Sequence, residues 1–170
     1  MNEYEHSEGV PSTAAILGHP IHPIMVGFPI AFLSGALLSD LAYLFLRDPF
    51  WAQASLWLVA AGVVSGLLAA VFGLTDFVTI RRARHATGWI HLVGNLLAVL
   101  LSLGNWIMRI EDPQEGVLPL GLVLSAIVAG ILLVTGWMGG ELAFRYKVGV
   151  IGTERRGDDP KTAAGQRPPS

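Results

Sequence analysis

Four long apolar runs dominate the chain, and short polar breaks separate them. The runs cover residues 24–46, 52–74, 86–108 and 117–139. Each has about 23 residues, and a helix of that length, at about 1.5 Å per residue, crosses a ~30 Å hydrocarbon core with some tilt. Because the breaks are short, consecutive helices must run antiparallel. The pattern predicts an all-α integral membrane protein, an antiparallel four-helix bundle within residues 18–150.

The two ends of the chain differ from this apolar middle. Residues 1–17 form a polar, acidic segment without the basic region of a cleaved signal, so we expect the first span to stay in the membrane as an anchor. Residues 151–170 are polar and rich in Pro and Gly, a composition that predicts a disordered tail.

Composition supports the membrane assignment and excludes several functions. The chain of 170 residues is 52% hydrophobic and only 14% charged, whereas soluble domains carry about 25% charged residues. Its net charge of −2 gives no basic field for nucleic acid. It has no cysteine, which leaves His, Asp and Glu as the strong metal ligands. Without a Gly-x-Ser-x-Gly motif, a phosphate loop or a soluble catalytic domain, hydrolytic enzyme activity is not expected.

Lysine and arginine lie mostly on one side of the predicted membrane. Nine of the eleven cations fall in the second loop or after the fourth span, and only Arg47 and Arg109 fall in the other two loops. Cations near span ends favour the cytoplasm. The bias therefore predicts that both termini are cytoplasmic and that the two short acidic loops are external.

Small and polar residues mark the helix faces that should pack together, since close approach and hydrogen bonds drive helix association in lipid. The third span shows one such stripe, with residues three and four positions apart: Gly88, His91, Asn95, Ala98, Ser102 and Asn105. The second span has a similar one: Gly62, Gly66, Ala69, Gly73 and Asp76. Both stripes predict a closely packed bundle.

Most of the ionisable residues should meet in one layer at the cytoplasmic face. Antiparallel spans place the start of the first and third beside the end of the second and fourth. The residues at those positions are His19, His22, Asp76, His85, His91, Glu141 and Arg145. Among them His91 should lie deepest, about 7 Å inside its helix. An ionisable group at that depth is a functional hypothesis by default.

Three chemistries could use this layer. The first is a b-type haem with His91 and either His22 or His19 as axial ligands. The second is a divalent metal bound by His19, His22, His91 and a carboxylate of Asp76 or Glu141. The third involves no cofactor, with histidines and acids bonding to one another and to nearby backbone.

Two features outside this argument also carry expectations. The prolines in His-Pro-Ile-His-Pro, residues 19–23, should bias His19 and His22 away from helical conformation. Asp40 lies in the outer half of the first span, where we expect it to pair with Asn105 or water. A proton or ion relay from Asp40 to the histidine layer is a further hypothesis.

Four motifs make the chain similar to a known family, the bacterial membrane proteins that share a domain of unknown function numbered 2231. They are GHPIHPIMVGFPIAF, GLTDF, HATGWIHLVGN and GWMGGELAFRYKVGV, within about Leu17 to Val150. The resemblance implies a four-span bundle in the bacterial cytoplasmic membrane with no settled activity. It also implies a histidine in the closing motif where this chain has Tyr146, while His19, His22 and His91 match.

The sequence leaves two main functions open. One is a haem- or metal-binding redox module, with a membrane or redox partner protein. The other is a non-catalytic scaffold or accessory subunit, whose basic inner face binds anionic lipid or a partner. Solute or proton transport is a third reading, although four glycine-packed helices leave little room for a pore unless the protein forms an oligomer.

Overall fold

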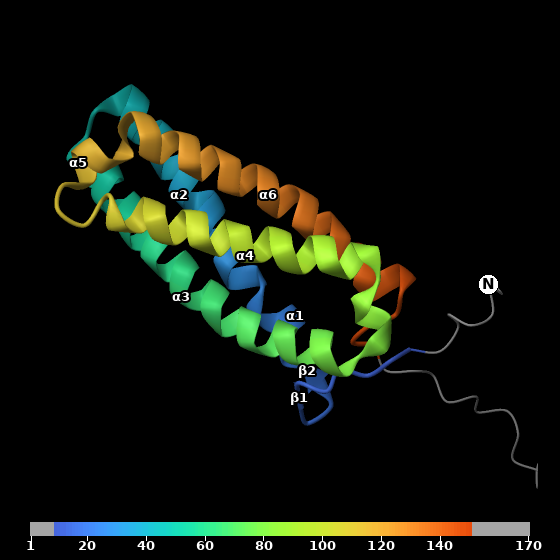
Figure 1. Ribbon diagram of the computed structural model, residues 1–170. Helices are drawn as coiled ribbons and strands as arrows, with labels where there is room; N and C mark the ends of the chain where they lie inside the picture. The colour runs from blue at the N-terminus through green and yellow to red at the C-terminus, as the bar shows by residue number, and fades with distance from the viewer. Residues whose placement is uncertain (1–8, 151–170) are drawn as a thin grey trace, which may run out of the picture.

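Four long helices run antiparallel in an elongated bundle, which a computed structural model describes for residues 9–150 (Figure 1). All four are long and apolar enough to cross a membrane. The helical elements are α1 (Ile21–Met25), α2 (Gly27–Leu46), α3 (Pro49–Thr79), η2 (Arg81–Arg84), α4 (Ala86–Ile107), α5 (Pro113–Gly116), η3 (Val117–Gly121), α6 (Leu122–Gly140) and η4 (Glu141–Arg145). The predicted all-α membrane bundle is confirmed. The spans are Ile21–Leu46, Pro49–Thr79, Ala86–Ile107 and Pro113–Arg145, so each overlaps its predicted run.

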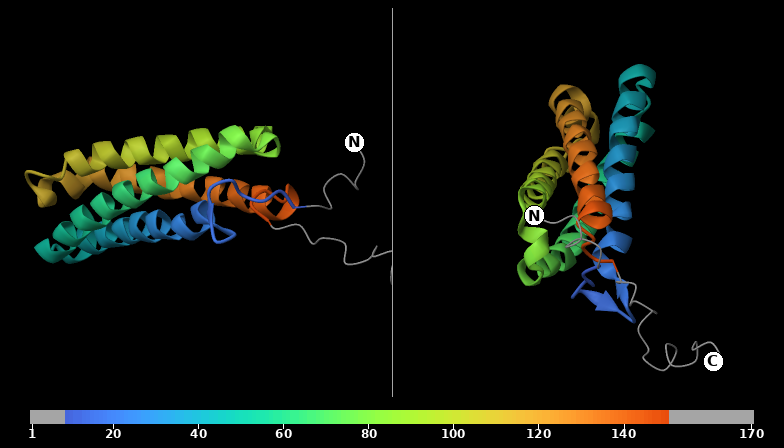
Figure 2. Two further views of the ribbon diagram at one scale, coloured as in Figure 1. Left: turned by 90° about the horizontal axis from the view of Figure 1, so that it is seen from below. Right: turned by 90° about the vertical axis from the view of Figure 1, so that its right-hand side faces the viewer.

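A small β-hairpin precedes the first helix and crosses the predicted boundary between the polar segment, residues 1–17, and the membrane domain. Its strands are β1 (Ala15–Ile16) and β2 (His19–Pro20), which pair antiparallel. The two residues between them, Leu17 and Gly18, both have positive φ, of 51° and 80°. Such values are what a tight two-residue hairpin turn requires. This hairpin, the start of α4 and the end of η4 lie at the same end of the bundle (Figure 2).

The prolines of the first span lie where a helix tolerates them. Pro23 is the third residue of α1, and backbone N–H groups in a first turn have no partner within the helix. Pro29 lies close to the junction of α1 and α2, where its lack of an N–H removes one hydrogen bond of the span. His22 is therefore helical despite the proline that follows it, contrary to our expectation, whereas His19 is in an extended strand.

At the opposite end of the bundle, an aspartate caps the helix that follows each connection. Asp48 accepts a hydrogen bond from the backbone N–H of Phe50, and Asp112 accepts from the N–H groups of Gln114 and Glu115. A proline follows each aspartate at the first helical position, an arrangement that favours helix initiation. These caps fix where α3 and α5 begin.

Packing inside the bundle uses small side chains, while large apolar ones face outward. Leu38, Phe45 and Leu133 are exposed by 67%, 79% and 79%, as expected of residues that face lipid. Gly62 lies directly against Leu33, since a Cβ on it would overlap the leucine side chain. Thus the glycine stripe of the second span does pack against a neighbouring helix.

Candidate functional site

Polar side chains gather at the two ends of the bundle. We call the end that holds His22 and His91 the histidine end, and the end that holds Asp40 and Arg109 the ion-pair end. A core layer of Leu33, Ala98 and Val128 lies between them. The histidine end is the one where the sequence predicted a layer of ionisable residues.

At the histidine end, the two half-buried imidazoles of His22 and His91 face each other. Their ring centroids are 6.1 Å apart and their planes are nearly perpendicular, at 87°. His22 Nδ1 lies 2.9 Å from the carbonyl oxygen of Ala69, and His91 Nδ1 lies 2.8 Å from that of Thr135. Because a carbonyl oxygen can only accept, both Nδ1 atoms must carry the proton. In the neutral rings, each Nε2 then keeps its lone pair.

A glycine on the neighbouring helix makes room for each ring. A Cβ on Gly73 would lie 2.7 Å from Nδ1 and Cε1 of His22, and one on Gly139 would lie 3.2 Å from Cε1 of His91. Each glycine comes four residues after the residue whose carbonyl binds the ring, Ala69 or Thr135. The same local arrangement therefore occurs twice, once between α1 and α3 and once between α4 and α6.

Asp76 lies at the same end but binds the N-terminal segment. Its carboxylate accepts from the Ser12 hydroxyl at 2.6 Å, from the Thr13 N–H and hydroxyl at 2.9 and 3.0 Å, and from the Ala14 N–H at 3.0 Å. Four such bonds occupy most of the acceptor sites of a carboxylate. The role of Asp76 in this structure is thus to hold residues 12–14 against the end of α3.

The other predicted members of the layer have partners of their own. His19 is exposed, and its Nδ1 lies 3.0 Å from the carbonyl oxygen of Leu17. Glu141 forms an exposed ion pair with Arg145 at 3.1 Å. The ring of His85 stacks on Tyr146 at 5.4 Å. Within residues 9–150, no three His, Asp or Glu side chains lie close enough to hold a metal ion. Among the predicted ligands in the described part of the chain, the structure brings His22 and His91 together.

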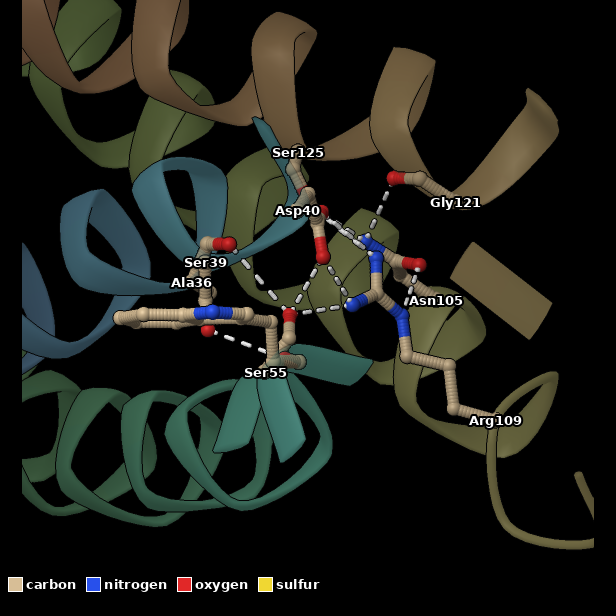
Figure 3. Close-up of polar contacts among 9 residues, drawn as sticks. Ala36, Ser39, Asp40, Ser55, Asn105, Arg109, Gly121 and Ser125 are labelled. Atoms are coloured by element: carbon tan, nitrogen blue, oxygen red, sulfur yellow. Dashed lines mark hydrogen bonds and ion pairs between the residues drawn. The ribbon is translucent and has the colours of Figure 1, made fainter. Parts of the chain in front are cut away.

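The ion-pair end contains a fully buried salt bridge that the sequence analysis missed (Figure 3). Arg109 Nη1 and Nη2 donate to the two carboxylate oxygens of Asp40, at 2.6 and 2.9 Å. Both side chains are 0% exposed. We had expected Asp40 to pair with Asn105 or water and had counted Arg109 as a loop cation. Both expectations were wrong, because Arg109 turns into the bundle at the end of α4.

Every long helix contributes to the cluster around this ion pair (Figure 3). Arg109 Nε donates to Asn105 Oδ1 at 2.9 Å, and Nη2 also donates to Ser125 at 3.2 Å. Nη1 contacts Ser55, whose hydroxyl donates to Asp40. The Asn105 amide completes the network by donating to the Gly121 carbonyl oxygen at 3.2 Å and to Ser125 at 3.0 Å.

The same spacing along the chain separates the histidine from the charged residue in each of the two spans. Asp40 follows His22 by 18 residues, and Arg109 follows His91 by the same number. Eighteen residues correspond to five helical turns, about 27 Å along each span. Arg109 also continues the polar stripe of the third span, four residues after Asn105. That continuation was the available signal for its inward orientation.

Comparison with known proteins agrees with this architecture. The family model described as "Predicted membrane protein (DUF2231)" matches residues 18–152. Neither a curated protein nor a solved structure matches the chain. The match spans most of the chain and includes all four helices and both polar ends. The chain therefore belongs to the DUF2231 family of predicted membrane proteins.

Proposed function

We propose that this protein is a membrane redox protein that binds a b-type haem, with His22 and His91 as the two axial ligands of the iron. The observation that carries the proposal is the pairing of two imidazoles, 6.1 Å apart, from the two halves of the bundle. When bound, the haem would supply one-electron transfer. The chain would supply the two ligands, their orientation and an apolar surrounding.

The hydrogen bonds of the two rings suit this role. Histidines that ligate metals usually donate their other ring N–H to a carbonyl or carboxylate, which fixes the tautomer and the ring orientation. His22 and His91 each donate Nδ1–H to a backbone carbonyl and so keep Nε2 available. The separation of 6.1 Å between their ring centroids would allow one metal ion to be held by a nitrogen of each ring.

The number of available ligands favours haem over a bare divalent metal. A structural zinc site normally needs four protein ligands and a catalytic one needs three, whereas haem brings its own equatorial nitrogens. In the described part of the chain, the predicted carboxylate ligands are engaged elsewhere, Asp76 with residues 12–14 and Glu141 with Arg145. Two imidazoles are what the axial positions of a haem require.

Tyr146 bears on this proposal because the resemblance implied a histidine at its position. Its ring stacks on His85, which is not part of the facing pair. The bis-histidine proposal therefore uses only His22 and His91 and leaves Tyr146 without a ligand role.

The test is an absorption spectrum of the full chain, purified in detergent from haem-supplemented cells. We expect a Soret band, one haem per chain, and low-spin bands on reduction. His22→Gln and His91→Gln should each lose the low-spin spectrum, while the matched controls His19→Gln and His85→Gln should keep it. Absence of a Soret band in the wild type, or an unchanged spectrum in the His22→Gln/His91→Gln double variant, would refute the proposal.

A second candidate function is that of a non-catalytic membrane scaffold or accessory subunit. It is supported by the many acids with partners inside the chain, including Asp40, Asp76 and Glu141. In this case the His22→Gln/His91→Gln variant should fold and recover the same partners as the wild type. The haem spectrum distinguishes the two candidates, because a scaffold gives none.

We also propose that the protein lies in the bacterial cytoplasmic membrane with the histidine end inside. The distribution of cations supports this orientation more strongly once Arg109 is removed from the loop count, because it is buried in the ion pair and Arg47 alone remains on the other side. A reporter fused after Ser170 should be active only in its cytoplasmic form. Activity of a periplasmic reporter at this position would mean that the protein has the opposite orientation.

A further inference from the structure

An apolar groove runs along the outer surface of the bundle between α4 and α6. It has a volume of about 410 Å³, and its lining is almost wholly apolar. The lining includes Ile90, Gly94, Leu97, Ile127, Gly130 and Val134. A Cβ on Gly130 would meet no atom within 4 Å, so this glycine leaves open space in the groove. A second glycine, Gly94, packs tightly against Thr135.

The size and position of the groove suit a lipid acyl chain. Its residues extend over eight positions of α4, from Ile90 to Leu97, and nine of α6, from Ile127 to Thr135, about 10–12 Å along the helices. It opens where the side chains of Ile90, Ile127 and Val134 are about half exposed, on a surface that faces the bilayer. Polar atoms contribute almost nothing to the lining, so a ligand with a polar group inside the groove would lack a hydrogen-bond partner.

Cations lie near the end of the groove that faces the histidine end of the bundle. Arg84 is exposed and precedes α4, six residues before Ile90. Arg145, at the end of η4, has a side chain that is 72% exposed beyond its ion pair with Glu141. The stacking of His85 on Tyr146 brings these two chain segments together.

We propose that the groove and these arginines form a binding site for an anionic phospholipid. One acyl chain lies between α4 and α6, and the phosphate headgroup contacts Arg84 and Arg145. Cations near an anionic headgroup contribute about 1 kcal/mol each, so loss of one arginine should weaken binding roughly fivefold. This site is independent of the haem proposal, because it uses neither His22 nor His91.

Native mass spectrometry of the detergent-solubilised full chain tests the site. We expect phosphatidylglycerol to remain bound in preference to phosphatidylethanolamine with the same acyl chains. Gly130→Leu should abolish this retention by filling the groove. Gly104→Leu is the matched control, since Gly104 is also exposed with nothing within 4 Å of an added Cβ but does not line the groove.

The charged part of the site has its own variants. Arg84→Gln and Arg145→Gln should each weaken retention of phosphatidylglycerol about fivefold, while Arg47→Gln, at the other end of the bundle, should not. Equal retention of the two lipids, or full retention by Gly130→Leu, would overturn the proposal. It would also be overturned by a wild-type dimer that Gly130→Leu dissociates, because the occupant would then be a second copy of this chain.

Discussion

Each polar end of the bundle pairs a side chain from the first span with one from the third span or its end. The two pairs differ in how they are bonded. At the ion-pair end, Asp40 and Arg109 are fully buried, and every nitrogen of the guanidinium donates to an acceptor. At the histidine end, His22 and His91 are half-buried, and each ring forms a hydrogen bond to a backbone carbonyl. Every N–H donor of the guanidinium is used, whereas each imidazole keeps a nitrogen lone pair that can bind a ligand.

Charge explains why the two ends differ. A buried ion pair is tolerated only when all its donors and acceptors have partners, because removing charge from water costs several kcal/mol per ion. A neutral imidazole carries a much smaller penalty and can leave one nitrogen unused. The ion-pair end should therefore control stability, and the histidine end should control function.

Breaking the ion pair should have the largest effect on stability. Arg109→Leu leaves the carboxylate of Asp40 buried without its partner, which we expect to lower the free energy of unfolding by about 3–5 kcal/mol. Circular dichroism during unfolding in mixed detergent measures this change.

The matched control removes both charges. Asp40→Leu/Arg109→Leu replaces the pair with apolar side chains and should recover most of the lost stability, since apolar replacement of a buried pair is often neutral. If the single variant is as stable as the double one, then Arg109 does not stabilise the buried charge of Asp40.

The next largest effect should come from Asn105, which orients the guanidinium. Asn105→Leu removes the acceptor for Arg109 Nε and the donor to Gly121, and should lower stability by about 1–3 kcal/mol. Asn95→Leu, on the same helix but near the histidine end, leaves no buried charge without an acceptor and should have a smaller effect. The same unfolding assay compares them, and the reverse order would contradict the difference between the two ends.

The sequence predicted the architecture well because its signals are local. Span length, loop length and the spacing of Gly62, Gly66 and Ala69 follow from helix geometry and require no knowledge of distant contacts. The convergence of His22 and His91 was predictable from antiparallel topology, since both lie near the start of an odd-numbered span.

The partners of the charged residues were harder to predict. Arg109 appeared to belong to a loop because cations near span ends usually face water, and only the i, i+4 relation to Asn105 suggested otherwise. Asp76 binds Ser12 and Thr13, more than 60 residues away, just before a hairpin that hydropathy does not reveal. Such long-range hydrogen bonds depend on tertiary packing, which periodicity does not encode.

The repeated glycine contacts allow a finer test within the histidine end. Gly73→Ala places a Cβ 2.7 Å from the ring of His22, whereas Gly139→Ala places one 3.2 Å from the ring of His91. Overpacking of this kind typically costs about 1–3 kcal/mol, so we expect the first variant to lie within that range and the second below it. Unfolding of the two variants side by side measures the order. Equal losses of stability would mean that the two glycines leave the same space for their histidine rings.

Removing the imidazoles should have the smallest effect on stability. His22→Leu and His91→Leu each delete one hydrogen bond to a carbonyl that lies inside a helix and keeps its helical N–H partner. The expected loss in the absence of added haem is about 0.5–1.5 kcal/mol for each, nearly equal because the two arrangements are repeats. A loss as large as that of Arg109→Leu would mean that the histidines hold the bundle together, and the contrast between the two ends would then fail. A small loss of stability combined with complete loss of the low-spin haem spectrum would instead separate the functional pair from the structural one.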